Sequence, residues 1–76
     1  MTIKQSTTKE LDGAGYVFSG KLARIIADLH QIKESNAERR FREMENEDII
    51  EKKLVDNPSG GNKVVAYRLK VKDTLF

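Results

Sequence analysis

Apolar residues recur with helical spacing in two adjacent segments of the chain. In the first segment, from Ser19 to about Glu34, they lie three and four positions apart, at Leu22, Ile25, Ile26 and Leu29. This spacing predicts an amphipathic helix with one buried stripe. Ser19 is its predicted N-cap, because a serine hydroxyl accepts a hydrogen bond from a free backbone N–H at a helix start.

The second helical segment opens with a capping box, Ser35-Asn36-Ala37-Glu38. The box predicts a new helix start, so we expect the break between the two helices at residues 34–35. Ala37, Phe41 and Met44 follow at spacings of four and three, which predicts one buried stripe. We expect this helix to end near residues 46–48.

The pattern then changes to that of a β-hairpin. Residues 49–56 are β-prone at both ends, and Asn57-Pro58-Ser59-Gly60-Gly61-Asn62 is the strongest turn signal in the chain. Residues 63–72 alternate, which predicts a strand with one buried and one wet face. The buried face would hold Val65, Tyr67, Leu69 and Val71, and the wet face Val64, Ala66, Arg68, Lys70 and Lys72.

The first eighteen residues are weakly patterned. We expect residues 1–18 to form a partly flexible arm, with at most a short helix near Thr8–Asp12. Tyr16–Phe18 fits either a short strand or the lead-in to the first helix. The predicted organisation is therefore an arm over residues 1–18, an α+β domain over residues 19–72 and a tail over residues 73–76.

Length and composition exclude several kinds of site. The 76 residues allow one small domain at most, and the absence of cysteine removes disulfides, thiolate nucleophiles and cysteine-ligated zinc. His30 is the single histidine, so one chain cannot build a multi-histidine metal site. We see no nucleophile–base pair in the sequence, and we expect no enzyme, no metal and no cofactor.

Segments for membrane insertion or secretion are not recognisable either. No apolar run approaches the ~20 residues that a membrane-spanning helix needs. Residues 1–10 lack the apolar stretch of a secretion signal. We therefore expect a soluble intracellular domain without a membrane partner.

The order of helix, break, helix and hairpin carries a resemblance to a known family. Ala37-x-x-x-Phe41-x-x-Met44, then Asp48-Ile49-Ile50-Glu51-Lys52, then Tyr67-Arg68-Leu69 after the glycine-rich turn, resembles winged helix-turn-helix DNA-binding domains. Upstream, Leu22-Ala23-x-x-Ile26 is similar to the family's scaffold helix. Asp48 departs from the family, which usually has glycine there, and residues 1–15 offer no clear counterpart of the family's first helix.

The resemblance implies an α+β winged helix-turn-helix, with two or three helices followed by a β-hairpin wing. It implies sequence-specific binding of double-stranded DNA by a small, repressor-like transcriptional regulator, acting as a homodimer in the cytoplasm of a prokaryotic cell or a phage-infected host. The recognition helix would enter the major groove, and the wing would lie on the DNA backbone or minor groove.

The same resemblance implies which residues would meet DNA, with Arg39 as the foremost base reader. On the recognition helix these are Ser35, Asn36, Arg39, Arg40 and Arg42, and on the wing Lys52, Lys53, Asn62, Lys63, Arg68 and Lys70.

The charge distribution leaves a second hypothesis open. The formal net charge of +2 combines a basic hairpin region with a helix that is basic at its start and acidic at its end. The acidic side chains Glu43, Glu45, Glu47 and Asp48 would instead carry the contact of a protein-interaction module on the same scaffold. The arginines 39, 40 and 42 would then be a solvated face, paired with glutamates three or four positions away.

Overall fold

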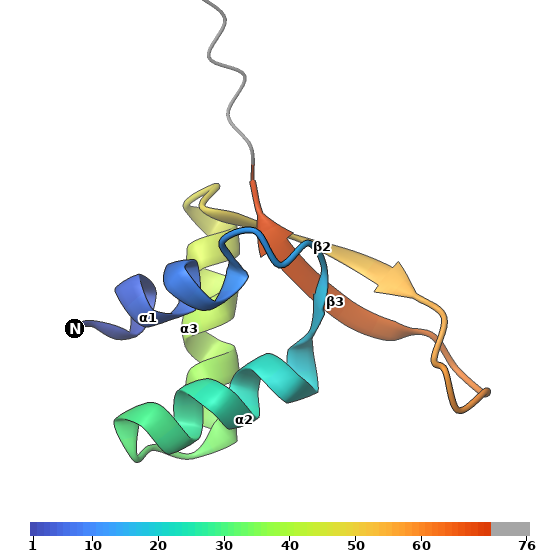
Figure 1. Cartoon of the computed structure of the whole chain (residues 1–76), viewed down its shortest axis with the longest axis horizontal. Helices are drawn as coiled ribbons and strands as arrows, with labels where there is room; N and C mark the ends of the chain where they lie inside the picture. Colours follow the sequence, from blue (N-terminus) through green and yellow to red (C-terminus); the bar gives the residue numbers. More distant parts are fainter. Residues whose placement is uncertain (71–76) are drawn as a thin grey trace, which may run out of the picture.

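The computed structural model describes residues 1–70 and shows an α+β chain with three helices and a three-stranded antiparallel sheet. The elements, in chain order, are α1 (Ile3–Leu11), β1 (Val17–Phe18), α2 (Ser19–His30), α3 (Glu34–Asn46), β2 (Ile50–Val55) and β3 (Val64–Leu69). The helices gather at one end, and the β2–β3 hairpin extends away from them (Figure 1). This order is compatible with a winged-helix arrangement.

Helix α1 replaces most of the arm that the sequence predicted. It begins at a capping box, in which the Thr2 hydroxyl accepts from the Gln5 N–H (3.1 Å) and the Gln5 side chain accepts from the Thr2 N–H (2.9 Å). The prediction of only a short helix near Thr8–Asp12 is wrong, since α1 starts earlier and is longer. A helix is therefore present in the part of the chain where the sequence pattern offered no clear first helix.

Polar residues on the inner face of α1 explain why the hydrophobic pattern did not predict it. Ser6 and Thr7 are fully buried beside Leu11. The Thr7 hydroxyl donates to the Ile3 carbonyl (2.8 Å), and the Ser6 hydroxyl lies 2.7 Å from Nε2 of His30 on α2. Because both hydroxyls have partners, burying them carries little penalty, and α1 docks with few apolar residues.

Both predicted ends of the helix at Ser19 need correction. Ser19 is already helical, and the N-cap is Phe18, which makes no side-chain capping bond. The helix ends at His30 rather than near Glu34, because Gln31 adopts a left-handed conformation (φ 54°) and its N–H donates to the Ala27 carbonyl. This conformation satisfies a terminal carbonyl and turns the chain toward α3.

The buried face of α2 is also rotated from the predicted stripe. Its fully buried residues are Leu22, Ala23, Ile26 and Ala27. Leu29, predicted to lie in the core, is 58% exposed. Ile32, from the connector after α2, packs against the core instead.

Helix α3 begins one residue before the predicted capping box. Its N-cap is Lys33, and no side-chain capping bond is present, so the box between Ser35 and Glu38 is not formed. Ser35 already has its backbone inside the helix, which leaves its hydroxyl unable to act as a cap. The predicted core stripe is confirmed, because Ala37, Phe41 and Met44 are all inaccessible to solvent.

The hairpin follows the sequence prediction except at Ala66, which was predicted on the wet face and is 1% exposed, because β1 pairs beside it through Phe18. Asp48, with φ 62°, makes the turn after α3, and the next N–H, that of Ile49, donates to the Met44 carbonyl (3.0 Å). Aspartate accepts this left-handed conformation better than most residues. Strands β2 and β3 then pair from Ile50↔Leu69 to Val55↔Val64. Val71, Lys72 and the predicted tail lie outside the described residues.

The hairpin tip is built from its own turn residues. The Asn57 side chain accepts from the Ser59 N–H (3.0 Å), and the Asn57 carbonyl accepts from the Gly60 N–H (2.8 Å). Gly60 and Gly61 both have φ near +90°, a conformation that residues with a Cβ rarely adopt. The predicted turn is confirmed.

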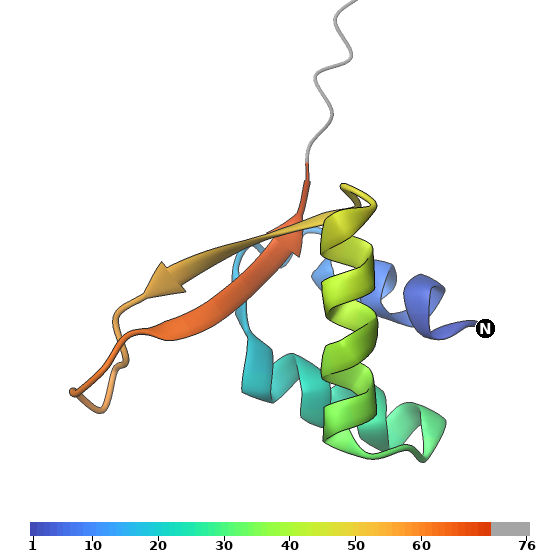
Figure 2. The same ribbon diagram turned by 180° about the vertical axis from the view of Figure 1, so that it is seen from behind.

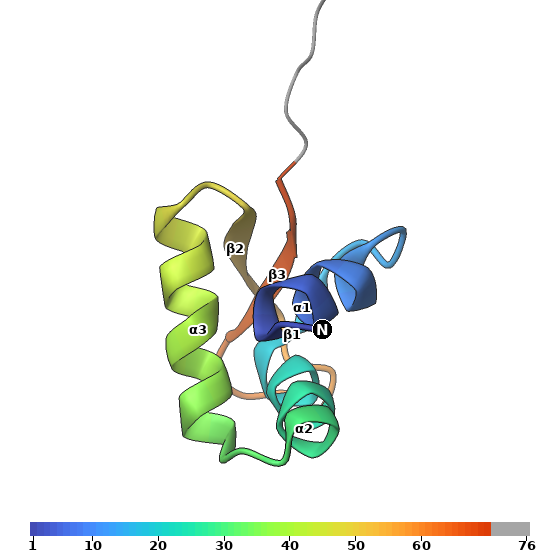
Figure 3. The same ribbon diagram turned by 90° about the vertical axis from the view of Figure 1, so that its left-hand side faces the viewer.

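The core lies between the helices and the inner face of the sheet. Phe41 of α3 meets Tyr67 of β3 edge to face, with ring centroids 5.6 Å apart. Strand β1, one of the two structures that fitted Tyr16–Phe18, pairs with β3 through Val17↔Tyr67. Seen from behind and from the side, α3 stands beside the base of the hairpin, and none of the other described helices and strands covers its outer side (Figures 2 and 3).

Candidate nucleic-acid interface

The outward face of α3 carries a continuous polar stripe. Ser35, Arg39, Arg42 and Asn46 follow one another at steps of four, three and four residues, and all four are exposed. Because residues at these steps share one side of a helix, the stripe lies opposite the buried residues Ala37, Phe41 and Met44. We call these four residues the α3 stripe.

Two of the predicted base readers lie to the side of this stripe, toward α1. Arg40 lines a shallow hollow with Thr2, Ile3 and Lys4, and it forms an ion pair with Glu43 (3.1 Å). Asn36 and Arg40 also line a second hollow beside Ile3 and Ile32, together with Arg39 and Glu43. Arg40 and Asn36 are therefore turned away from the hairpin, whereas Arg39 lies between the two faces.

A cleft of about 420 Å³ separates α3 from the hairpin on the other side of the stripe. Its lining comes from α2, α3 and both long strands: Ser19, Glu38, Arg42, Glu45, Asn46, Lys52, Val65 and Tyr67. Lys52 faces into it because it lies in register with Tyr67, whose ring belongs to the core. We call this the α3–hairpin cleft.

The other predicted wing residues divide into three places. Asn62 and Lys63 are exposed at the hairpin tip. Lys53 and Arg68 lie on the outer face of the sheet, where their cationic groups sit 5.5 and 4.8 Å from the Tyr16 ring centre. Lys70 lies at the base of the hairpin and pairs with Asp48 (3.0 Å).

The structure thus brings together only part of the predicted set. Arg42 and Lys52 line the α3–hairpin cleft together, and Ser35 and Arg39 share the α3 stripe with Arg42. Asn62 and Lys63 lie apart from them, at the hairpin tip. Lys53 and Arg68 face the opposite side of the sheet, and Arg68 is bound to Glu51 by an ion pair.

Acidic side chains near the end of α3 are each matched by a base. Glu43 pairs with Arg40, Glu45 with Lys52 (4.0 Å) and Glu47 with Lys4 (2.7 Å), and Asp48 pairs with Lys70. These four carboxylates point to different neighbours around the helix end. Within residues 1–70 they do not form one continuous acidic face.

Two groups near these surfaces have shifted pKa values. Burial raises the pKa of Tyr67, the nearby Glu45 and Glu38 carboxylates raise it further, and the Arg42 guanidinium opposes them. The hydrogen bond to Glu51 is the main cause that raises the pKa of Arg68. The Tyr67 phenol therefore interacts electrostatically with the charged groups that line the α3–hairpin cleft.

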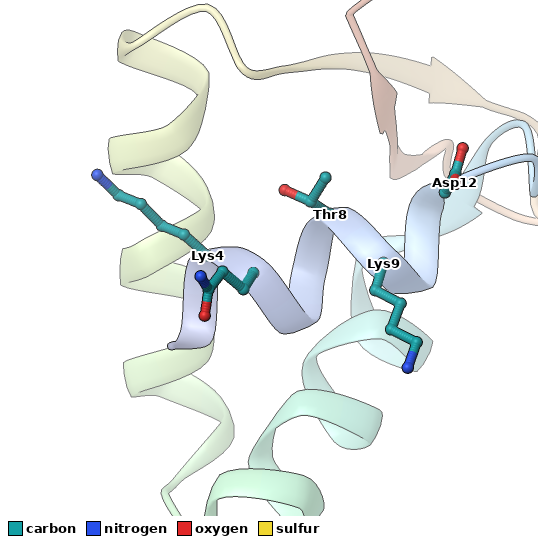
Figure 4. Close-up of a pocket in the computed structure, with 5 residues that line it drawn as sticks. Lys4, Thr8, Lys9 and Asp12 are labelled. Carbon is teal, nitrogen blue, oxygen red and sulfur yellow. The ribbon is translucent and has the colours of Figure 1, made fainter. Parts of the chain in front are cut away.

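The hollow over α1 is open and offers no recognisable chemistry (Figure 4). It measures about 380 Å³ and is lined by Lys4, Gln5, Thr8, Lys9 and Asp12. Lys4 and Lys9 point away from each other in Figure 4, and Lys4 is held by Glu47. These side chains make no arrangement of nucleophile and base.

One serine–histidine contact was not foreseen from the sequence. Ser6 and His30 lie 24 positions apart and meet at 2.7 Å, yet Ser6 is only 1% exposed. A substrate therefore cannot reach this hydroxyl, and the contact joins α1 to the end of α2. Among residues 1–70, no three acidic, histidine or cysteine side chains gather as metal ligands, and none of the helices has the length and apolarity to cross a bilayer.

Comparison with known proteins does not add to this description. The chain gives no significant match to a protein-family model, to a curated protein or to a solved structure.

Three residues at the candidate interface were missed or misassigned from the sequence. Asn46 continues the α3 stripe, and the step of four from Arg42 was the signal for it. Leu54 is 60% exposed, and its register with Val65 places it on the inner face of the hairpin. Glu38, predicted to be a capping residue, instead lines the α3–hairpin cleft.

Proposed function

We propose that this chain is a winged helix-turn-helix domain that binds double-stranded DNA in a sequence-specific manner, as a small repressor-like transcriptional regulator. The observation that carries the proposal is the α3 stripe, with its two exposed arginines, standing next to a hairpin that extends past the helices. The order of three helices and a terminal hairpin, with β1 pairing beside β3, also supports it.

The α3 stripe has the shape and chemistry to read bases. The major groove of B-DNA, about 12 Å wide, admits one α-helix, and its guanine edges offer two acceptors to a bidentate arginine. Arg39 and Arg42 are both exposed, on the side of α3 that no other element of residues 1–70 covers. We assign them to base edges and Ser35 and Asn46 to neighbouring bases or phosphates.

The hairpin supplies the backbone contacts in this proposal. Lys52 lies at the mouth of the α3–hairpin cleft, and Lys63 lies at the tip beside Asn62. Lysines bind phosphates as point charges, and contacts to phosphates carry no direct sequence information. Four other predicted residues do not contact DNA in this proposal and keep the surface ion pairs or cation–π contacts that they make in the free protein: Arg40, Lys53, Arg68 and Lys70.

A protein-docking function of the acidic helix end is the weaker alternative. Glu43, Glu45, Glu47 and Asp48 are each paired with a basic neighbour. A partner protein that bound these carboxylates would first have to displace their lysine and arginine partners. The two arginines of the α3 stripe can bind DNA without breaking an ion pair, because they form none within the described residues.

We propose that two copies act together on DNA. One α3 stripe covers only a few base pairs, and a two-fold dimer reads two half-sites about one helical turn apart. The half-sites would then form an inverted repeat. A selected target of this form supports the homodimer, and a single asymmetric half-site opposes it.

The experiment is selection of binding sites from duplexes with a randomised centre, followed by affinity measurements between about 50 and 200 mM salt. We expect a defined site to be enriched and its affinity to fall steeply as salt rises. Lys63→Ala should weaken binding to all sequences alike and reduce the salt slope by about one unit for each bound copy. Absence of enrichment and of low-salt binding, with specific recovery of a protein, would favour the docking function instead.

A further inference from the structure

Glu38 holds an unusual place on α3. It makes no capping bond, because the helix begins at Glu34 with Lys33 as N-cap. It is half-buried and lines the α3–hairpin cleft beside Arg42, which lies one turn further along the helix. A capping role, which the sequence suggested, therefore does not explain this carboxylate.

The Glu38 carboxylate also lacks the kind of partner that its neighbours have. On the same helix, Glu43 pairs with Arg40 and Glu45 lies 4.0 Å from Lys52. Within residues 1–70, Glu38 makes neither an ion pair nor a hydrogen bond. Its charge is nevertheless felt inside the cleft, since it contributes to the raised pKa of the Tyr67 phenol. Glu38 thus presents free acceptor oxygens next to a base-reading arginine.

An ionised carboxylate can contact DNA favourably at only a few atoms. It only accepts hydrogen bonds, so phosphate oxygens repel it and the acceptors of guanine cannot pair with it. In the major groove, the exocyclic amino groups of cytosine and adenine are the donors. Adenine presents its N7 acceptor next to its amino group, which opposes a second carboxylate oxygen. Cytosine presents its amino donor without such a neighbour.

We infer that Glu38 selects a cytosine in the target, by accepting a hydrogen bond from the cytosine N4 amino group. Arg42, four residues further along the same side of α3, reads a guanine close to that cytosine. Glu38 is therefore a specificity-determining residue. This inference rests on the proposed function and deepens it.

The test compares binding sites selected by the wild-type chain, Glu38→Gln and the matched control Glu43→Gln. We expect each half-site selected by the wild-type chain to contain one invariant C·G pair at the position that Glu38 reads. Because glutamine both donates and accepts, Glu38→Gln should exchange that cytosine for adenine, which glutamine pairs through N6 and N7. Glu43→Gln removes a charge from the same helix on the face away from the cleft, and it should retain the wild-type site.

Affinities then measure the contact directly. On the wild-type site, Glu38→Gln and Glu38→Ala should each weaken binding by roughly tenfold, within the range of one lost base contact. Replacing the C·G pair should weaken the wild-type chain by a similar factor but leave Glu38→Ala unchanged. Far-UV circular dichroism checks that each variant remains folded, and the base-pair replacement needs no variant at all.

The outcomes separate the two proposals. If the chain binds DNA and Glu38→Gln selects the same cytosine as the wild type, the role of Glu38 is overturned and DNA binding stands. If the wild-type chain enriches no sequence and binds no duplex, the proposed function fails and the role of Glu38 fails with it.

Discussion

Tyr67 joins the core to the candidate interface. Its ring packs edge to face on Phe41, and its remaining surface lines the α3–hairpin cleft. Burial, assisted by the Glu45 and Glu38 carboxylates, raises its pKa above the ordinary value of 10.0. One side chain therefore links the packing of the domain to the charges at the surface.

The raised pKa of Tyr67 predicts a specific dependence of stability on pH. The unfolded chain releases the phenolic proton at lower pH than the folded chain does. The resulting stabilisation is fully present below pH 10 and is lost as pH rises through the higher pKa of the folded state. Tyr67→Phe removes the titrating group, so its free energy of unfolding should fall less above pH 10 than that of the wild type.

Urea unfolding at pH 8 and at several values above pH 10 measures this difference. At pH 8 the two proteins should differ little, because the Tyr67 hydroxyl makes no hydrogen bond within residues 1–70. Parallel losses of stability in both proteins above pH 10 would contradict the burial of this phenol.

At the scale of elements, the capping box lies at the start of α1 and not at the start of α3, where the sequence predicted it. The capping box forms at Thr2 and Gln5, and it is absent at Ser35 and Glu38. A capping hydroxyl contributes about 1 kcal/mol to stability, whereas an exposed serine inside a helix contributes little. The contributions of the Thr2 and Ser35 hydroxyls to the free energy of unfolding can therefore be compared in the same protein.

We expect Thr2→Ala to lower the free energy of unfolding by about 1 kcal/mol. Ser35→Ala should change it by less than about 0.5 kcal/mol, because Ser35 is exposed and does not cap α3. Urea unfolding of both variants measures the two effects. A larger loss for Ser35→Ala would mean that α3 begins where the sequence pattern placed its box.

The sequence predicted the elements whose signals are local. The buried stripe of α3 and the turn at residues 57–62 depend on spacing and on turn chemistry, and both are confirmed. Helix α1 escaped prediction because Ser6 and Thr7 fill core positions, and their partners include His30 on another helix. The end of α2 escaped because nothing local marks Gln31 as left-handed; the packing of Ile32 accompanies that turn.

The candidate site was predictable only as a set of side chains. All the predicted residues of α3 and of the hairpin are exposed, but their grouping depends on which way each one faces. Arg40 lines two hollows beside α1, whereas Arg39, one position earlier, lines only one of them and also belongs to the α3 stripe. The ion partners of Arg40, Lys52, Arg68 and Lys70 come from the folded arrangement, which the net charge of the sequence does not reveal.

At the scale of the whole molecule, the α3 stripe takes part in none of the ion pairs formed within residues 1–70. Basic and acidic side chains form ion pairs along the α1 side of α3 and where the hairpin joins the helices. Within residues 1–70, no ion pair holds the arginines of the α3 stripe, and Lys63 is exposed at the hairpin tip. A small net charge is thus compatible with the proposed DNA-binding surface, whose affinity we expect to depend strongly on salt.

The central claim is that the α3 stripe, rather than the surface of α3 as a whole, reads DNA. It is tested most directly by the dissociation constants of Arg39→Ala, Arg42→Ala and Arg40→Ala on the selected duplex at one salt concentration. All three variants lose one arginine from the same helix, so their net charges are equal.

We predict that Arg39→Ala and Arg42→Ala each weaken binding by roughly tenfold or more, the loss of one bidentate base contact. Arg40→Ala should stay within about twofold of the wild type, since it loses only an exposed ion pair with Glu43. Equal effects of the three variants, or the largest loss for Arg40→Ala, would contradict the proposed interface.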